Sequence, residues 1–278
     1  MLSYWLGAEK ARVRCLTRLF SRRKTFFMSM NDGVKTAIRT VNLFEAFSRR
    51  KGPMTLTQIA EALSAPISSC HGLVRTLSAK GYLYTSERNR AIYPTKRLLE
   101  IANTIAAHDA VLESTVPVLE TLRDETNETI LLGRRQGETI LYLDVLEGHQ
   151  TVRYSAGAGD IKPMHSSAMG KAFLGRLDAG ERAALVARLP LDLYTPNTIT
   201  ERATLEADLA DGIAKGYFIT RGENVVDVMG LATTADVYGE IMGVAIAGPL
   251  MRMMVGEAKL AAMLLSARTR LETLGVRS

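Results

Sequence analysis

Residues 55–83, TLTQIAEALSAPISSCHGLVRTLSAKGYL, decide the fold of the N-terminal part of the chain. Apolar residues recur at helical spacing on both sides of Ser64-Ala65-Pro66-Ile67, a stretch that favours a turn. The pattern predicts one short helix over residues 58–63 and a second over residues 68–80, joined by that turn. Two helices in this arrangement are typical of a helix-turn-helix motif.

Hydroxyl and glycine residues stand at the expected ends of these helices. Thr57 and Ser68 precede the two helices, and a hydroxyl at that place can accept a hydrogen bond from a free backbone amide. Gly81 follows the second helix, where helices commonly end in a left-handed residue. We therefore predict Thr57 and Ser68 as N-caps and Gly81 as the terminating residue.

The flanking segments complete a winged domain. Residues 34–47 carry a continuous apolar stripe at helical spacing, which predicts a preceding helix. Residues 82–84 and 91–93 have the composition of two short strands around an Asn-containing turn that holds Arg88 and Arg90. Three helices followed by this hairpin predict a winged helix-turn-helix domain.

The second helix of the motif is expected to expose a face that suits DNA. Its apolar residues predict one buried side, which leaves small and polar side chains and Arg75 on the other side. Such a helix can enter a major groove about 12 Å wide, and arginines at a wing tip can reach phosphates or the minor groove. A helical hairpin that contacts another protein remains the alternative. The residues expected at a DNA interface are Thr57, Ser68, Ser69, His71, Gly72, Arg75, Thr76, Arg88 and Arg90.

Charge is divided unevenly along the chain. Residues 31–97, the predicted winged domain, hold eleven Lys and Arg against four acidic residues, whereas residues 98–278 hold seventeen against twenty-four. Clustered cations favour a double-stranded DNA partner for the N-terminal part, because neutralising phosphates needs cations in one place. Residues 1–30 are also basic. We interpret this extension as a mis-called start codon, since Met28 and Met30 precede the first organised segment, or as a DNA-contacting arm.

Composition and motifs exclude several other classes. The chain has no stretch approaching the roughly 18 apolar residues of a membrane span. Cys15 and Cys70 are too few for a disulfide framework or a zinc site, which favours a reducing cytoplasm. P-loop, dinucleotide-binding and nucleophile-elbow motifs are missing, and the four histidines lack metal-ligand spacing. We therefore expect no enzyme activity, no cofactor and no metal.

The remainder of the chain predicts an α+β domain. Residues 98–110 form an apolar band that predicts a linker helix, which packs either on its own domain or on a second copy of the chain. Residues 111–278 alternate helices with strands, which suggests an antiparallel sheet. The expected strands are 129–134, 139–146, 151–154, 217–220, 230–234 and 241–247, and the expected helices are 111–123, 168–177, 181–188, 203–215 and 255–274.

Six segments, in this order, carry a resemblance to a known family. They are TLTQIAEAL (55–63), SSCHGLVRTL (68–77), KGYL (80–83), YPTKRLLE (93–100), HSSAMGKA (165–172) and TPNTIT (195–200). With them the chain resembles the IclR-type transcriptional regulators. The resemblance implies a GAF-like effector-binding domain, a homodimer or homotetramer, and a DNA-binding regulator controlled by a small molecule. A small-molecule-binding module whose helices contact only protein is the competing hypothesis.

Two departures from the family pattern affect the expected chemistry. Members usually carry Arg after the His of the recognition helix, where this chain has Gly72, so a base contact is lost or the backbone approaches DNA closely. In many members an acidic residue, a cysteine and serines line the effector pocket. Counting along this chain places Thr220, Gly230, Ala245 and Ala247 at those positions.

The second departure predicts the kind of effector. A pocket with fewer polar groups cannot pair a short keto acid fully, and each unpaired buried polar atom costs about 1–3 kcal/mol. We therefore expect a larger aromatic or apolar carboxylic acid, with Arg221 or the amides near Ser166 and Ser167 receiving its carboxylate. A filled core that binds nothing is the alternative. The expected effector-binding residues are Met164, Ser166, Ser167, Ala168, Met169, Gly170, Thr220, Arg221, Gly230, Ala245 and Ala247.

Overall fold

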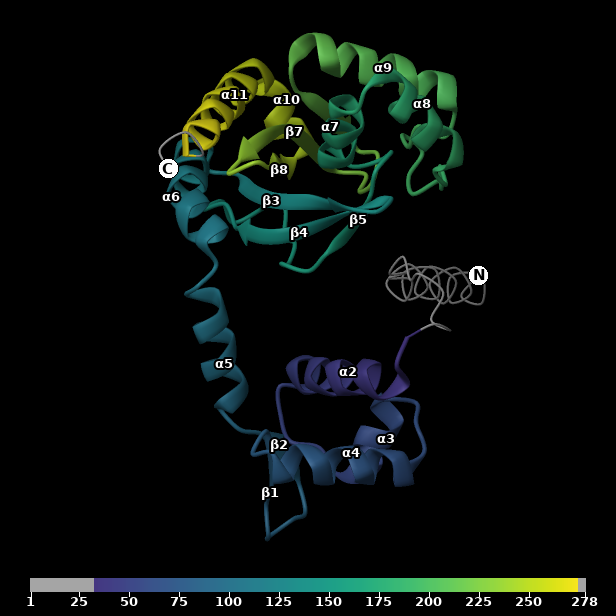
Figure 1. Cartoon of the computed structure of the whole chain (residues 1–278), viewed down its shortest axis with the longest axis vertical. Coiled ribbons are helices and arrows are strands. Elements are labelled where there is room, and N and C mark those ends of the chain that lie inside the picture. The colour runs from purple at the N-terminus through teal and green to yellow at the C-terminus, as the bar shows by residue number, and fades with distance from the viewer. Residues whose placement is uncertain (1–32, 275–278) are drawn as a thin grey trace, which may run out of the picture. The chain divides into compact units, whose positions relative to one another are not determined.

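The computed structural model describes residues 33–274, which divide into two compact units (Figure 1). The first unit ends at Asp109 and the second begins at Ala110. The basic extension predicted over residues 1–30 lies outside the described residues.

The described part of the N-terminal unit packs three helices against a small hairpin, and a fourth helix follows. Its helices enclose a core that includes Leu43, Ile59 and Cys70, none of which is exposed to solvent. Strand β1 pairs with β2 in antiparallel register, and Met54 adds a single bridge to Ile92 of the hairpin. The elements are α2 (Lys35–Arg50), α3 (Leu56–Ala62), α4 (Ile67–Ala79), β1 (Leu83–Thr85), β2 (Ile92–Pro94) and α5 (Arg97–Ala106).

Both predicted N-caps are wrong by two residues. Helix α3 is capped by Thr55, whose hydroxyl accepts a hydrogen bond from the amide of Gln58 while the Gln58 side chain accepts one from the Thr55 amide. This reciprocal pair satisfies two amides at once, so the helix starts earlier than Thr57 alone would allow. Helix α4 begins after Pro66, without a side-chain cap, and Ser68 lies inside its first turn.

The C-terminal unit is built on one six-stranded antiparallel sheet in the order β5-β4-β3-β8-β7-β6. Strands β3, β7 and β8 are buried on both faces along most of their length, which explains why they consist of small and apolar residues rather than alternating patterns. The strands are β3 (Thr129–Gln136), β4 (Thr139–Leu146), β5 (Ile161–Pro163), β6 (Phe218–Arg221), β7 (Val228–Val237) and β8 (Glu240–Pro249).

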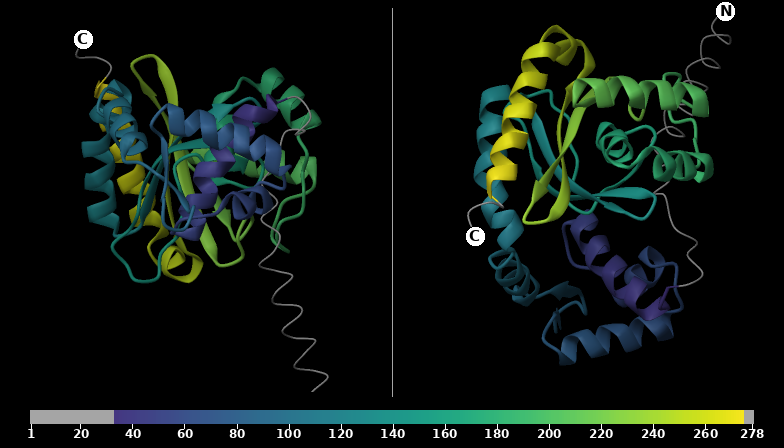
Figure 2. Two further views of the ribbon diagram at one scale, coloured as in Figure 1. Left: turned by 90° about the horizontal axis from the view of Figure 1, so that it is seen from below. Right: turned by 45° about the horizontal axis from the view of Figure 1, so that its top comes forward.

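Helices cover both faces of this sheet (Figure 2). One face packs against α6 and α11, and the opposite face against α7 with α8 and α9 beyond it. A GAF-like α+β sensor domain was expected, and the mixed architecture with an antiparallel sheet agrees with that expectation. The helices are α6 (Ala110–Thr126), α7 (Ala168–Arg176), α8 (Ala179–Arg188), α9 (Arg202–Lys215), α10 (Leu250–Val255) and α11 (Glu257–Leu274).

Two predicted elements of this unit need correction. Residues 151–154 are a loop, because no described strand pairs with this segment. The carbonyl of Tyr154 accepts a hydrogen bond from the Thr129 hydroxyl instead, at 2.6 Å. The free edge of β4 is instead occupied by β5, which was not predicted. The last helix, expected over residues 255–274, is α11, which begins at Glu257 after Gly256; the short helix α10 before it was not predicted.

Candidate DNA interface and effector pocket

The outer face of α4 presents the residues predicted to contact DNA. Cys70 and Val74 point into the core, while Ser69, Arg75 and Thr76 are exposed on the other side of the helix. The hydroxyl of Thr76 donates to the carbonyl of Gly72 one turn earlier, at 3.0 Å. Ser68 and His71 are also exposed, as is Thr57 on α3. The face is therefore small and polar, and its arginine, Arg75, pairs with no carboxylate in the part of the chain that the structure describes.

Gly72 leaves a gap in this face. A methyl group added at its α-carbon would meet no atom within 4 Å, so packing within the described residues does not require glycine there. Glycine lowers the stability of a helix interior by about 1 kcal/mol relative to alanine. Close approach of DNA to the backbone at this position, or the loss of one base contact, therefore stays a prediction.

The hairpin tip carries the two wing arginines. Backbone bonds between Ser86 and both Arg90 and Ala91 close the tip, and Arg90 adopts a left-handed backbone conformation with a φ of 54°. Arg88 and Arg90 are both exposed, and neither pairs with a carboxylate among the described residues. Their guanidinium groups are thus available to an external anion.

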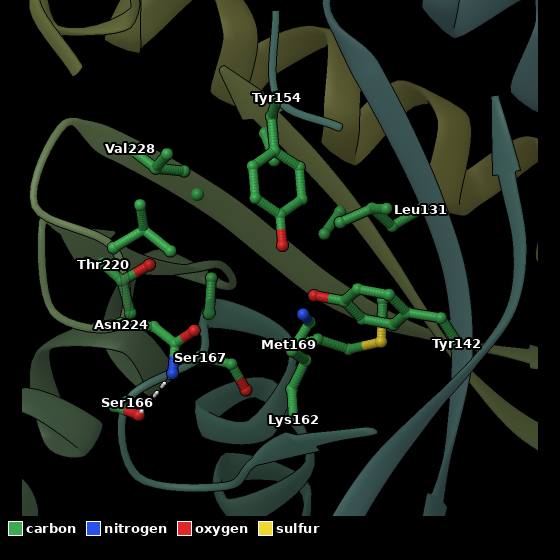
Figure 3. Close-up of a pocket in the computed structure, with 15 residues that line it drawn as sticks. Leu131, Tyr142, Tyr154, Lys162, Ser166, Ser167, Met169, Thr220, Asn224 and Val228 are labelled. Carbon is green, nitrogen blue, oxygen red and sulfur yellow. Dashed lines mark hydrogen bonds between the residues drawn. The ribbon is translucent and has the colours of Figure 1, made fainter. Parts of the chain in front are cut away.

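A pocket lies between the N-terminal end of α7 and the sheet (Figure 3). It has a volume of about 450 Å³ with its open mouth counted. Small residues of β7 and β8, among them Gly230, Ala245 and Ala247, form one wall and keep the space open. The full lining is Leu131, Tyr142, Tyr154, Lys162, Ser166, Ser167, Ala168, Met169, Thr220, Asn224, Val225, Val228, Gly230, Ala245 and Ala247.

Eight of the eleven predicted effector residues line this pocket. Met164 and Gly170 do not; they pack on each other behind it, where a methyl group on Gly170 would overlap the backbone of Met164. Arg221 is a correction. Its side chain is about half exposed and pairs with Glu257 at 2.6 Å, because neighbouring residues of strand β6 face opposite sides of the sheet and Thr220 faces the pocket.

The polar end of the pocket was not predicted. Tyr142 and Tyr154 direct their hydroxyls toward each other and into the pocket (Figure 3). Burial raises the pKa of the Tyr142 phenol well above its ordinary value, and the neighbouring Tyr154 phenol adds to the shift. The ammonium of Lys162 lies 5.6 Å from the centre of the Tyr142 ring and 3.1 Å from Asp160 Oδ2. The alternating pattern of strand β4 could have predicted that Tyr142 faces inward. No sequence pattern around Lys162 predicts that it lies in the pocket.

Two family models match the chain over most of its length. The description "IclR helix-turn-helix domain" matches residues 36–87, and "Bacterial transcriptional regulator IclR C-terminal" matches residues 103–272. The chain belongs to the IclR family of bacterial transcriptional regulators. It is thus a DNA-binding regulator with a helix-turn-helix domain and an effector-binding C-terminal domain, and its curated relatives are regulators.

Individual relatives agree with this assignment. The HTH-type transcriptional regulator BhcR of Paracoccus denitrificans is 28% identical over 84% of this chain and 83% of its own length. The crystal structure of IclR from Thermotoga maritima matches 86% of this chain and 98% of its own, with a TM-score of 0.74 at 21% identity. An IclR homologue from Microbacterium hydrocarbonoxydans, complexed with 4-hydroxybenzoate, matches 87% of this chain and 100% of its own, with a TM-score of 0.70 at 22% identity.

A buried ion cluster supports the pocket of this IclR-family regulator from behind. The Lys171 side chain on α7 has no exposed surface, and its ammonium lies 2.8 Å from Asp208 Oδ2 and 2.8 Å from Glu223 Oε1. Glu223 Oε2 is buried without a hydrogen-bond partner, and burial raises the pKa of this carboxyl despite the nearby ammonium. The cluster connects α7 and α9 to the loop between β6 and β7, which closes the pocket with Asn224 and Val225.

The TPNTIT segment holds the same loop. The Thr195 hydroxyl donates to the Gly222 carbonyl and the Thr198 hydroxyl to the Glu223 carbonyl, both at 2.6 Å. Asn224 in turn donates to the hydroxyl of Ser166 at 3.3 Å. The two C-terminal sequence signatures of the family therefore meet at one loop of the pocket.

Two absences hold for the described residues, 33–274. No helix there has the length and hydropathy that a membrane crossing requires. Within the same residues, no group of three or more His, Cys, Asp or Glu side chains could hold a metal ion.

Proposed function

We propose that this regulator recognises its operator with α4 and the wing, and that a small carboxylic acid in the C-terminal pocket changes the affinity of that recognition. Arg75 supports the DNA assignment, because it is exposed on a small polar helix face and has no carboxylate partner within residues 33–274. Arg75 would contact a base edge, while Arg88 and Arg90 would contact phosphates or the minor groove. The other members of the interface would be Thr57, Ser68, Ser69, His71, Gly72 and Thr76.

The lining of the pocket carries the proposal for the effector. Apolar and small side chains dominate its walls, and its polar groups gather at separate places, which suits a ligand with an apolar body. We assign it an aromatic or apolar carboxylic acid larger than a three-carbon acid. A family member of the same fold was crystallised with 4-hydroxybenzoate, a ligand of this chemistry.

Thermal unfolding of the full chain tests the effector assignment. Aromatic acids such as benzoate and 4-hydroxybenzoate should raise the melting temperature, whereas glyoxylate and pyruvate should not, since bound ligand stabilises the native state. Ala247→Phe should abolish the response because Ala247 lines the pocket, while DNA binding persists. Ala203→Phe, the same change at an exposed position of α9, is the matched control. Stabilisation by the short acids alone would refute the assignment.

A second copy of the chain would complete the DNA-binding form. Helix α5 buries no residue, and its exposed apolar side chains include Leu99 and Ile105. Pairing of two such helices in a dimer would cover them and supply two recognition helices for two half-sites. We expect the double substitution Leu99→Asp and Ile105→Asp to reduce the molar mass measured by light scattering, because charged side chains would prevent this pairing. The location proposed for the protein is the cytoplasm, where the operator lies.

A further inference from the structure

Lys162 is the one charged residue among the described residues that line the pocket. Its side chain is largely buried, with 19% of its surface exposed, and it extends along β5 beside the aromatic ring of Tyr142. Its partner Asp160 is more exposed, at 44%, and does not line the pocket. The pocket wall therefore presents the ammonium group, while the countercharge lies outside the wall.

The fold holds this lysine in place. Strand β5 pairs with the edge of β4, with Lys162 opposite Ile140, and the backbone of Tyr142 bonds to both Asp160 and Gly159 in the loop before β5. The ammonium group of Lys162 is thus held by the ion pair with Asp160 and by the Tyr142 ring, and the backbone of Lys162 is held by the pairing of β5 with β4. A group positioned at two points loses little conformational freedom when a ligand binds.

We propose, on the basis of the function proposed above, that Lys162 selects an anionic effector and fixes its orientation, with Tyr142 and Tyr154 completing the anion site. The ammonium and one phenol hydroxyl receive the ligand's carboxylate. Both phenol hydroxyls point into the pocket, and a phenol hydroxyl can donate its proton to a carboxylate. The sequence pattern had offered Arg221, or the amides near Ser166 and Ser167, for this role.

The opposite side of the pocket then receives the body of the ligand. A carboxylate held at Lys162 directs an aromatic ring toward Met169, Ala245 and Ala247, which are apolar and buried. Thr220 and Asn224 lie beyond, and their polar groups suit a hydroxyl or similar substituent at the far end of the ring. A single bound orientation follows, because the positive charge stands at one end of the pocket.

The test compares benzoate with benzamide, a neutral molecule of nearly the same shape. Binding of each to the full-length protein is measured by calorimetry for the wild type, Lys162→Met and Lys162→Arg. We expect Lys162→Met to weaken benzoate binding by about 10-fold to 100-fold, as loss of a hydrogen bond to a charged group does, and to leave benzamide within about 2-fold. Lys162→Arg should retain the preference for benzoate. Lys215→Met, which alters a lysine far from the pocket lining, should change neither affinity.

The outcomes separate the role of Lys162 from the effector proposal. Wild-type binding of benzoate that Lys162→Met does not weaken would overturn the role of Lys162 and leave the effector proposal standing. Equal losses of benzoate and benzamide would also overturn it, because they would show a packing effect rather than charge selection. If no aromatic or apolar acid binds the wild type, both this inference and the effector proposal are wrong. Lys162→Arg supplies the answer should Lys162→Met fail to fold.

Discussion

Replacing Lys171 by methionine should destabilise the C-terminal unit strongly. The substitution keeps the length of the side chain, so the loss of charge rather than of volume is what it tests. Glu223, whose side chain is 9% exposed, would keep a buried carboxylate with no cation on either oxygen. Asp208 is 35% exposed and would be compensated by water, so most of the penalty comes from Glu223.

The magnitude follows from this burial. Removing one partner of a buried ion pair costs about 3–5 kcal/mol, because the remaining charge stays desolvated. In a domain of this size each kcal/mol lowers the melting temperature by roughly 2–4 °C, so we expect a decrease of roughly 6–20 °C. Differential scanning calorimetry at neutral pH measures it. Adding Glu223→Gln to Lys171→Met should restore part of the loss, because the orphaned charge is then removed.

The matched control is Lys215→Met. Lys215 has a closer carboxylate than Lys171, with Asp211 Oδ2 at 2.6 Å, but that pair is exposed to solvent. Water screens exposed pairs, so the control should leave the melting temperature nearly unchanged. A decrease for Lys171→Met no larger than that for Lys215→Met would refute the claim that burial makes this cluster a structural support of the pocket.

Three further predictions concern DNA and pH. Arg75→Ala should weaken operator binding by about 1–3 kcal/mol and relax the preference at one base pair. Arg88→Ala should instead weaken the binding of operator and scrambled DNA alike and reduce the salt dependence of binding. Titrations of both DNAs at several salt concentrations distinguish the two effects. Gly72→Ala should stabilise the protein to chemical denaturation by about 1 kcal/mol yet lower operator affinity, and unchanged affinity would exclude close backbone approach. Burial lowers the pKa of His165 below its ordinary value of 6.5. The free energy of unfolding that depends on neutral His165 should therefore be fully present above pH 6.5 and decrease as the pH drops toward the folded-state pKa. In His165→Gln this pH-dependent decrease should disappear.

Sequence patterns predicted the helices of the DNA-binding unit well and their starting points poorly. Periodicity identifies which residues face a core, and α4 buries Cys70 and Val74 as expected. The choice between Thr55 and Thr57 as N-cap depends on a partner. Gln58 stands three residues after Thr55, which is the spacing of a capping box, and this signal was present in the sequence.

The pocket shows where sequence reasoning stops. Arg221 could have been excluded by strand alternation, because Thr220 and Arg221 are neighbours in one strand and cannot both face one pocket. Lys162 could not have been found in the same way. It becomes a pocket residue only because β5 pairs with the edge of β4 and brings it beside Tyr142, a contact between distant segments that no local pattern records.

The most direct test of the account measures operator binding with and without an aromatic acid. Duplexes selected from random DNA by the full-length protein supply the operator, and fluorescence anisotropy at fixed salt gives its affinity beside that of a scrambled duplex. We predict a preference of at least about 1,000-fold for the selected sequence and a change of at least about 5-fold on adding benzoate, with scrambled DNA unaffected. Equal affinity for the two duplexes, or an operator affinity that no aromatic or apolar acid alters, would contradict the account.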